Sequence, residues 1–181
     1  MPVWMTQLKH VDPNLRRSAI RRAFLALATT RPFLFLTRHI SWKLDPFLLR
    51  ITGGRLSSAV GVRTAVLETR GAKSGELRRN AVIYFNDGER VTIIPSNAGS
   101  GRNPAWFHNL LADRDVTLGT IPMRATVVRA EAERRRLWEL ADRVFPPFEK
   151  FRRNAAAANR TIPIVQLVPC SVSRSERAPV R

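Results

Sequence analysis

The chain of 181 residues is long enough for one domain with a buried core, and its 44% hydrophobic content is that of a globular protein rather than a disordered one. Its 31 Lys and Arg against 14 Asp and Glu give a net charge of +17, which favours nucleic acid, an anionic membrane or a phosphorylated or carboxylated ligand as partner. The single cysteine, Cys170, excludes an intramolecular disulfide, and the three histidines lack companions at ligand spacing, so we expect no metal site.

Residues 1–50 predict a basic helical segment. Residues 1–14 have no periodic pattern and are expected to be loose, whereas apolar residues recur at helical spacing over 15–29 and a second apolar stretch with basic residues covers 33–49. We expect either two helices packed on the domain or a basic amphipathic element lying on an anionic bilayer through residues 15–50. No stretch is long and apolar enough to span a membrane. The expected location is therefore cytoplasmic, with the inner face of the plasma membrane as a peripheral site.

A β-rich region follows the helix-breaking residues 52–55. Strands are predicted over 63–69, 80–85, 91–95, 116–118, 123–128 and 162–168. The Asp87-Gly88 pair between the second and third strands is a hairpin signal.

Three helical elements interrupt the strands. The first covers 103–111, with Asn103 as the expected N-cap and Pro104 as the first helical residue. The second covers 131–144, and the third begins at Pro146 and Pro147. Six mostly antiparallel strands with flanking helices and no βαβ rhythm predict an α+β fold, a small barrel over residues 51–170. Residues 171–181 are expected to form a disordered basic tail.

Residues 71–75 (GAKSG) directly follow the first predicted strand. The two glycines allow a tight turn with exposed backbone amides, while Lys73 and Ser74 add a cation and a hydroxyl donor. These groups could bind an anion, with Arg78 close by. The alternative is an ordinary solvated hairpin turn.

A second turn, residues 96–107 (SNAGSGRNPAWF), follows the third predicted strand and leads into a helix. The free amides at a helix N-terminus favour phosphate or carboxylate, and Trp106 offers a flat wall for a ring. The alternative is a long loop before a helix, with Trp106 in the core. Two such turns in one small domain favour the binding interpretation.

Three phenylalanines, Phe145, Phe148 and Phe151, are spaced three apart, which is typical of core residues and also suits a pocket wall. The sequence has no closely spaced pair of carboxylates and no serine in a nucleophile elbow. Chemistry carried by a bound cofactor is therefore favoured over hydrolysis.

Taken in order, residues 69–75 (TRGAKSG), 96–99 (SNAG), 103–110 (NPAWFHNL) and 160–164 (RTIPI) resemble the deazaflavin-dependent nitroreductase family. This group of F420H2-dependent quinone and nitro reductases belongs to the flavin/deazaflavin oxidoreductase superfamily, and the likeness covers residues 45–169. It implies a split β-barrel in which reduced coenzyme F420 delivers hydride to a quinone, a nitroaromatic or a similar electrophile.

The resemblance also implies roles for individual residues. The cofactor's phosphate and oligoglutamate tail would be held by Lys73 and Ser74, with Arg78 nearby. The deazaflavin ring or its linker would contact Ser96, Asn97, Ala98 and Gly99, and the same groove would be lined by Asn103, Pro104 and Trp106. The side chains facing the substrate would be Phe145, Phe148 and Phe151.

Some positions depart from the family pattern. Ala72 stands where arginine is usual, and Ala81 where proline is common. Phenylalanine replaces the tyrosine that some members have at the substrate-side positions, so no phenol there can donate a proton. Solvent is then the expected proton source, and the expected substrate pocket is more apolar.

Two alternatives remain. A divergent family member could bind lipid at the membrane without cofactor, although Lys73, Ser74, Ser96 and Trp106 are retained. A basic β-barrel could instead bind nucleic acid, but this requires aromatic side chains exposed along a strand face, and none is predicted there. We therefore expect a small-molecule electron acceptor as partner and no nucleic acid.

Overall fold

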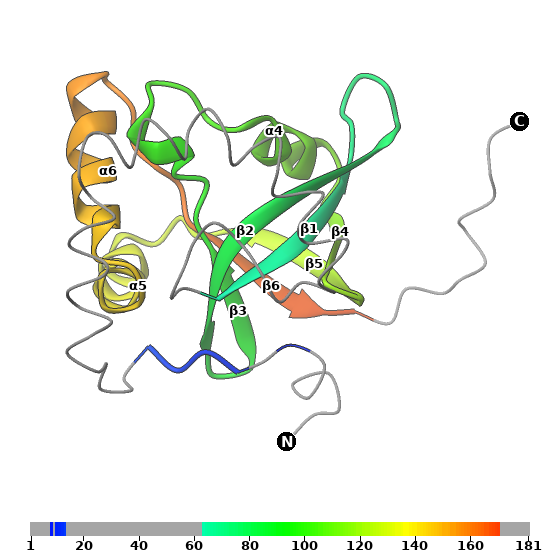
Figure 1. The fold of residues 1–181 in the computed structure, drawn as a ribbon, viewed down its shortest axis with the longest axis horizontal. Helices are drawn as coiled ribbons and strands as arrows, with labels where there is room; N and C mark the ends of the chain where they lie inside the picture. The colour runs from blue at the N-terminus through cyan, green and yellow to red at the C-terminus, as the bar shows by residue number, and fades with distance from the viewer. Residues whose placement is uncertain (1–7, 9, 14–62, 171–181) are drawn as a thin grey trace, which may run out of the picture.

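The computed structural model describes residues 8, 10–13 and 63–170, and within them six strands close into a barrel (Figure 1). The order around the barrel is β1-β2-β3-β6-β5-β4, with β4 pairing back to β1, and each of these pairs is antiparallel. The strands are β1 (Thr64–Arg70), β2 (Leu77–Asp87), β3 (Arg90–Ile93), β4 (Asp115–Leu118), β5 (Ile121–Val127) and β6 (Val165–Pro169). The predicted α+β barrel of six antiparallel strands is confirmed.

Three earlier predictions lie outside the described residues: the helical segment 1–50 apart from a few positions, the break at 52–55, and the basic tail 171–181. The membrane-surface interpretation of residues 15–50 falls there as well. Within the described part, no helix has the length and hydropathy needed to cross a membrane.

Alternating burial explains why these segments form strands. In β1, every second side chain is buried while its neighbours are partly exposed, which is the two-residue period of a strand with one face on a core. The β2–β3 hairpin turns at Gly88, whose φ of +58° suits glycine. The hairpin predicted from Asp87-Gly88 is therefore confirmed.

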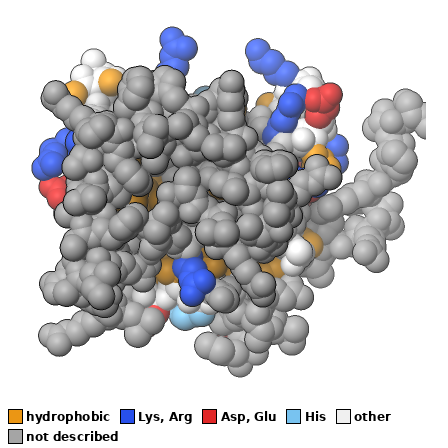
Figure 2. All heavy atoms as spheres, viewed as in Figure 1, with side chains coloured by type: hydrophobic (Ala, Val, Ile, Leu, Met, Phe, Trp, Pro, Cys, Tyr) orange, Lys and Arg blue, Asp and Glu red, His pale blue; other side chains and the backbone are white. Residues whose placement is uncertain are grey.

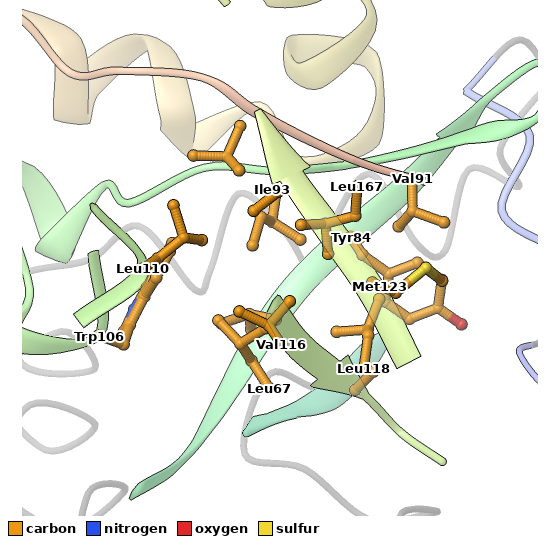
Figure 3. Close-up of a cluster of buried hydrophobic side chains, with 14 of the residues drawn as sticks. Leu67, Tyr84, Val91, Ile93, Trp106, Leu110, Val116, Leu118, Met123 and Leu167 are labelled. Atoms are coloured by element: carbon orange, nitrogen blue, oxygen red, sulfur yellow. The ribbon is translucent and has the colours of Figure 1, made fainter. Parts of the chain in front are cut away.

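The barrel interior forms the first core, which helix α4 (Ala105–Ala112) covers at one end. Figure 3 shows Trp106 and Leu110 of α4 lying beside side chains from the strands, among them Leu67 and Ile93. Trp106 is 7% exposed and Leu110 is 1% exposed, so both side chains belong to the core. This core fixes α4, and with it the turn that leads into the helix, relative to the strands.

The expectation that residues 1–14 are loose is wrong at two positions. Leu8 is buried in the first core, and Val11 packs against its edge. The Val11 amide donates to Asn86 Oδ1 at 2.9 Å, and the Asn86 amide donates to the Val11 carbonyl at 3.0 Å. Isolated apolar residues leave no periodic signal, so only their contacts with the barrel reveal this packing.

A second core lies between the outside of the barrel and helices α5 (Glu131–Val144) and α6 (Pro147–Ala157), which cover one side (Figure 1). The helix predicted over 131–144 is confirmed at both ends. The last strand begins three residues later than predicted, because Ile162 and Ile164 pack into this second core before β6 starts. An apolar run alone does not distinguish these two environments.

Ion pairs tie α5 to its surroundings. Arg136 bonds both carboxylate oxygens of Asp87, at 2.9 and 2.5 Å, and also pairs with Glu133. The guanidinium of Arg136 holds the pKa of Glu133 below its usual range. Between the helices, Arg152 makes two hydrogen bonds to Asp142. These contacts hold the two-helix layer in place beside the barrel.

Candidate functional site

The first candidate element is the hairpin tip between β1 and β2. Backbone hydrogen bonds close it: the Gly71 amide donates to the Glu76 carbonyl and the Gly75 amide to the Gly71 carbonyl, both at 2.8 Å. Gly75 has a φ of +68°, a backbone conformation that glycine adopts without strain because it has no Cβ. The tip presents Lys73 and Ser74 as exposed side chains.

The basic residues at this hairpin differ in their partners. Arg78 pairs with Glu76 at 2.6 Å, and Arg79 pairs with Glu68 at 2.8 Å. Within the described part of the chain, Lys73 makes no ion pair. In Figure 2, basic side chains lie around an acidic one at the upper right, where Figure 1 places this hairpin. Arg70 makes no ion pair among the described residues either, but it donates to the Gly75 carbonyl at 2.9 Å. Within the described part of the chain, Lys73 is therefore the cation of this hairpin whose side chain has neither an ion pair nor a hydrogen bond.

The second element is the turn after β3, which contains the short helix η1 (Asn97–Gly99). Ser96 has the backbone angles of a right-handed helix. Asn97 and Ala98 have φ of 47° and 51°, which lie in the left-handed region and are strained for residues with a side chain. Both are exposed, and among the described residues neither of their backbone amides donates a hydrogen bond. A right-handed residue followed by a left-handed one aims successive amides at one point, an arrangement that binds anions.

Contacts within the turn and against α6 hold its conformation. The Asn97 side chain donates to Ser100 Oγ at 2.8 Å and to the Arg102 carbonyl at 2.9 Å. Gly99 is buried against α6, and a Cβ there would lie 2.7 Å from the Phe151 carbonyl oxygen. The strained conformation is thus built into the packing of the turn on α6.

The prediction that Asn103 is the N-cap of the following helix is wrong. Pro104 is the extended residue before α4, and no side chain caps that helix. The side-chain Oδ1 of Asn103 instead accepts a hydrogen bond of 3.0 Å from Nε of Arg160. A hydrogen bond to a charged donor is stronger than one to a backbone amide, which explains why this pairing replaces the cap.

Arg160 and Asn109 are residues that reasoning from the sequence did not single out. Arg160 is 8% exposed and reaches the turn after β3. Asn109 lies on α4, accepts a hydrogen bond of 3.1 Å from the Ala72 amide, and donates one of 3.2 Å to Thr69 Oγ1. Both residues occur in the matched motifs, but only their contacts indicate a role.

Asn109 links the two candidate elements. It fastens the hairpin tip to α4, and α4 is the helix that directly follows the turn after β3. Figure 1 shows the hairpin, α4 and η1 along the same upper side of the molecule. The structure thus brings Lys73 and the strained turn to one end of the barrel, with α4 between them.

Replacing Asn109 by alanine should release the hairpin tip. The substitution removes the acceptor for the Ala72 amide and the donor to the buried Thr69 hydroxyl, so we expect a loss of about 1–2 kcal/mol in unfolding free energy. Amide exchange of Ala72 should also accelerate about fivefold or more. Urea unfolding and hydrogen exchange measure these effects.

Thr69→Val is the matched control, because it removes one partner of Asn109 and keeps the bond to Ala72. It should lower stability without accelerating exchange at Ala72. Equal exchange in the two variants would contradict a specific tether of the hairpin tip.

The aromatic residues differ in exposure. Trp106 lies in the first core, and Phe148 and Phe151, 2% and 8% exposed, lie in the second. Phe145 is half-buried and packs edge-on against Phe148, with ring centres 5.1 Å apart. Phe145 is therefore the phenylalanine of this group with the most surface to offer a ligand.

The only tyrosine of the chain, Tyr84, lies inside the barrel. It is 2% exposed, and burial raises the pKa of its phenol above the usual range. Tyr84 is thus a core residue, and a phenol is not available at the phenylalanine positions either.

Comparison with known proteins shows the family to which the chain is similar. The family model described as F420H(2)-dependent quinone reductase matches residues 46–169. F420H(2)-dependent quinone reductase Rv1261c of Mycobacterium tuberculosis (strain ATCC 25618 / H37Rv) is 28% identical over 143 residues, which cover 74% of this chain and 95% of the relative.

Solved structures give the same picture. A structure described as F420-H2 dependent reductase (FDR-A) matches with a TM-score of 0.50 and 25% identity, covering 57% of this chain and 92% of that one. Another, described as a domain-swapped dimer, shares the fold at 23% identity and a TM-score of 0.52, covering 70% and 96%. Since the family model matches well over half of the chain, this protein belongs to the F420H(2)-dependent quinone reductase family of oxidoreductases.

Proposed function

We propose that this protein reduces a quinone with hydride from reduced coenzyme F420, which it binds across the two turns at one end of the barrel. The observation that carries the proposal is the link through Asn109. This link places the exposed ammonium of Lys73 on one side of α4. The backbone amides of Asn97 and Ala98, which donate no hydrogen bond among the described residues, lie on the other side. An elongated anionic ligand is the class that matches such a pair of sites.

The residues present fit coenzyme F420. Its tail carries a phosphodiester and several glutamates, and Lys73 offers an uncompensated charge for it, with Ser74 beside it as a hydroxyl donor. Arg78 is already paired with Glu76 and should contribute less. At the other turn, the family resemblance assigns Ser96 and Asn97 to contacts with the deazaflavin ring or its linker.

Bound F420H2 supplies the hydride, and the protein supplies position and charge. Reduction of a quinone to a hydroquinone also needs a proton. Tyr84 is buried in the barrel and Phe145 has no hydroxyl, so neither side chain can donate one. We infer that the proton comes from solvent.

The acceptor is assigned to the apolar surface at Phe145, whose ring centre lies 6.1 Å from that of Phe151. Phe145 is half-buried and offers carbon surface without hydrogen-bond donors, which suits a flat apolar ring such as a quinone. A nitroaromatic would fit the same surface, and comparing the two acceptors distinguishes them. Quinone is preferred here because the matching family is described by that acceptor.

The alternatives find less support. A nucleic-acid-binding barrel needs aromatic side chains exposed on strands, whereas Trp106 and Phe148 are buried and belong to helices. A cofactor-free lipid binder would not need the strained turn kept in place.

The decisive experiment is a titration of the purified full-length protein with F420, followed by fluorescence. We expect saturable binding, and oxidation of F420H2 that depends on added quinone and is faster than with a nitroaromatic. No binding at tens of micromolar F420 would overturn the proposal. Faster turnover with the nitroaromatic would overturn the choice of acceptor.

Lys73→Ala should weaken F420 binding and leave turnover at saturating cofactor nearly unchanged. Loss of one exposed charge-assisted contact corresponds to about 1–2 kcal/mol, or about a five- to thirtyfold increase in Kd. Fluorescence titration and steady-state kinetics measure the two quantities.

The matched control is Arg79→Ala, which removes an exposed cation on β2 that is paired with Glu68. It should change Kd by less than about twofold, because paired surface charges contribute little. A large fall in kcat with unchanged Kd in Lys73→Ala would show that Lys73 does not act by holding the tail.

A further inference from the structure

We propose that Arg160 is a positioning residue, whose guanidinium holds residues 95–103 in the conformation that turns the amides of Asn97 and Ala98 toward the cofactor. The cofactor part of this inference rests on the function proposed above. The part concerning the turn rests on the contacts of Arg160 alone.

The guanidinium of Arg160 bonds four acceptors on this one turn. Nε donates to Asn103 Oδ1 at 3.0 Å, and Nη1 donates to the Ser96 and Ser100 carbonyls at 3.1 and 2.6 Å. Nη2 donates to the Pro95 carbonyl. The planar, rigid fork of arginine matches such a ring of carbonyls better than the flexible amine of lysine. The guanidinium therefore binds the beginning of the turn at residues 95 and 96, its middle at residue 100 and its end at residue 103.

Arg160 is itself held firmly. It directly follows Asn159, whose φ of 54° ends α6, and the Arg160 amide donates to the Ala155 carbonyl at 2.9 Å. The side chain thus projects from the end of a helix that is anchored in the second core. Arg160 therefore holds the turn in a defined position relative to α6.

The turn needs such support because its backbone is strained. Asn97 and Ala98 lie in the left-handed region, which residues with a side chain adopt only when their surroundings enforce it. Without the four hydrogen bonds, carbonyls 95, 96 and 100 could turn to water and the backbone could relax. The two exposed amides would then no longer point to one place.

The charge of Arg160 has a further effect. Its hydrogen-bond partners are all neutral, and it is 8% exposed. Burial lowers the pKa of the guanidinium from its ordinary value, but arginine stays protonated at neutral pH. A positive charge under the turn, to which no carboxylate of the described residues is bonded, favours an anionic group above the turn.

Two substitutions separate geometry from charge. Arg160→Lys keeps the charge but cannot reach all four acceptors, and Arg160→Gln removes the charge as well. In the ligand-free protein, hydrogen exchange of the bonded amides within residues 96–102, those of residues 96, 99, 100 and 102, should accelerate about tenfold or more in both variants. Kd for F420 should rise about tenfold in Arg160→Lys and more in Arg160→Gln, and kcat at saturation should fall.

Arg152→Gln is the matched control. Arg152 also lies on α6 and makes two hydrogen bonds, but these go to Asp142 and not to the turn. This variant should lower Tm while leaving exchange of residues 96–102 and Kd for F420 within about twofold of wild type. If Arg160→Gln does not fold, Arg160→Lys and Asn103→Ala, which removes one acceptor, provide the same readouts.

The outcomes are distinct. Unchanged exchange of residues 96–102 in folded Arg160→Lys would overturn the inference, as would equal acceleration in Arg152→Gln. Accelerated exchange with unchanged Kd and kcat would leave Arg160 a purely structural residue and overturn its positioning role. Failure of the wild-type protein to bind F420 would instead overturn the proposed function, while the exchange measurement would still decide whether Arg160 holds the turn.

Discussion

Replacing Gly99 by alanine is expected to lower the unfolding free energy by about 3 kcal/mol or more and to displace the turn after β3. Two effects add. Gly99 has a φ of +78°, which disfavours any side chain, and its added Cβ would lie 2.7 Å from the Phe151 carbonyl oxygen and 2.9 Å from Phe151 Cα. Since these are backbone atoms of α6, the turn must move instead. Urea unfolding and F420 titration should show lower stability and weaker binding together.

Gly88→Ala is the control for backbone strain alone. Gly88 has a similar φ of +58°, but an added Cβ would meet no atom within 4 Å. We expect a loss of about 1–2 kcal/mol from strain and no change in F420 affinity. If both glycine variants lose the same stability and bind F420 equally well, the close packing of the turn on α6 is not what sets the site.

Replacing Phe148 by alanine should remove about 3–5 kcal/mol of stability. The ring is 2% exposed and packs against Trp138, Phe145 and Phe151, with ring centres 5.1 to 6.3 Å apart. Such a loss is a large part of the stability of a typical domain. Thermal unfolding measures it, and Phe148→Leu serves if the alanine variant does not fold.

Phe145→Ala tests the substrate-side role that the family resemblance implies. Because Phe145 is half-buried, the stability loss should be smaller, about 1–2 kcal/mol, while the KM for a quinone should rise about fivefold. Phe148→Leu should leave that KM unchanged. A larger effect on KM from Phe148 than from Phe145 would mean that the second core opens to admit the acceptor.

The barrel could be predicted because its signals are local. Alternating apolar residues define β1, and the Asp87-Gly88 pair fits a hairpin in which neighbouring strands pair. The order of motifs also led to the family, since a series of short segments is far more specific than any one of them. Strand ends were less predictable, and Ile162 and Ile164 extend the apolar run of β6 while serving the second core.

The candidate site was predictable as two turns but not as one arrangement. Lys73 and residues 96–99 could be chosen from the sequence, because glycine and small polar residues after a strand are typical of anion-binding turns. Asn103 was misassigned as a helix cap, because its real partner lies far along the chain. The family likeness named the ligand class, but it did not indicate how the turns are held.

By itself, the sequence determined the composition of the protein, the strands of its barrel and the family to which it belongs. Only the tertiary structure decided that Asn109 joins the hairpin to α4 and that Arg160 gathers the turn after β3. The physical reason is the range of these contacts. The acceptors of Arg160 lie 57 to 65 positions away from it, and Asn109 lies 37 positions from Ala72. Hydrogen bonds at such separations form only when the barrel closes, and no local sequence pattern predicts them.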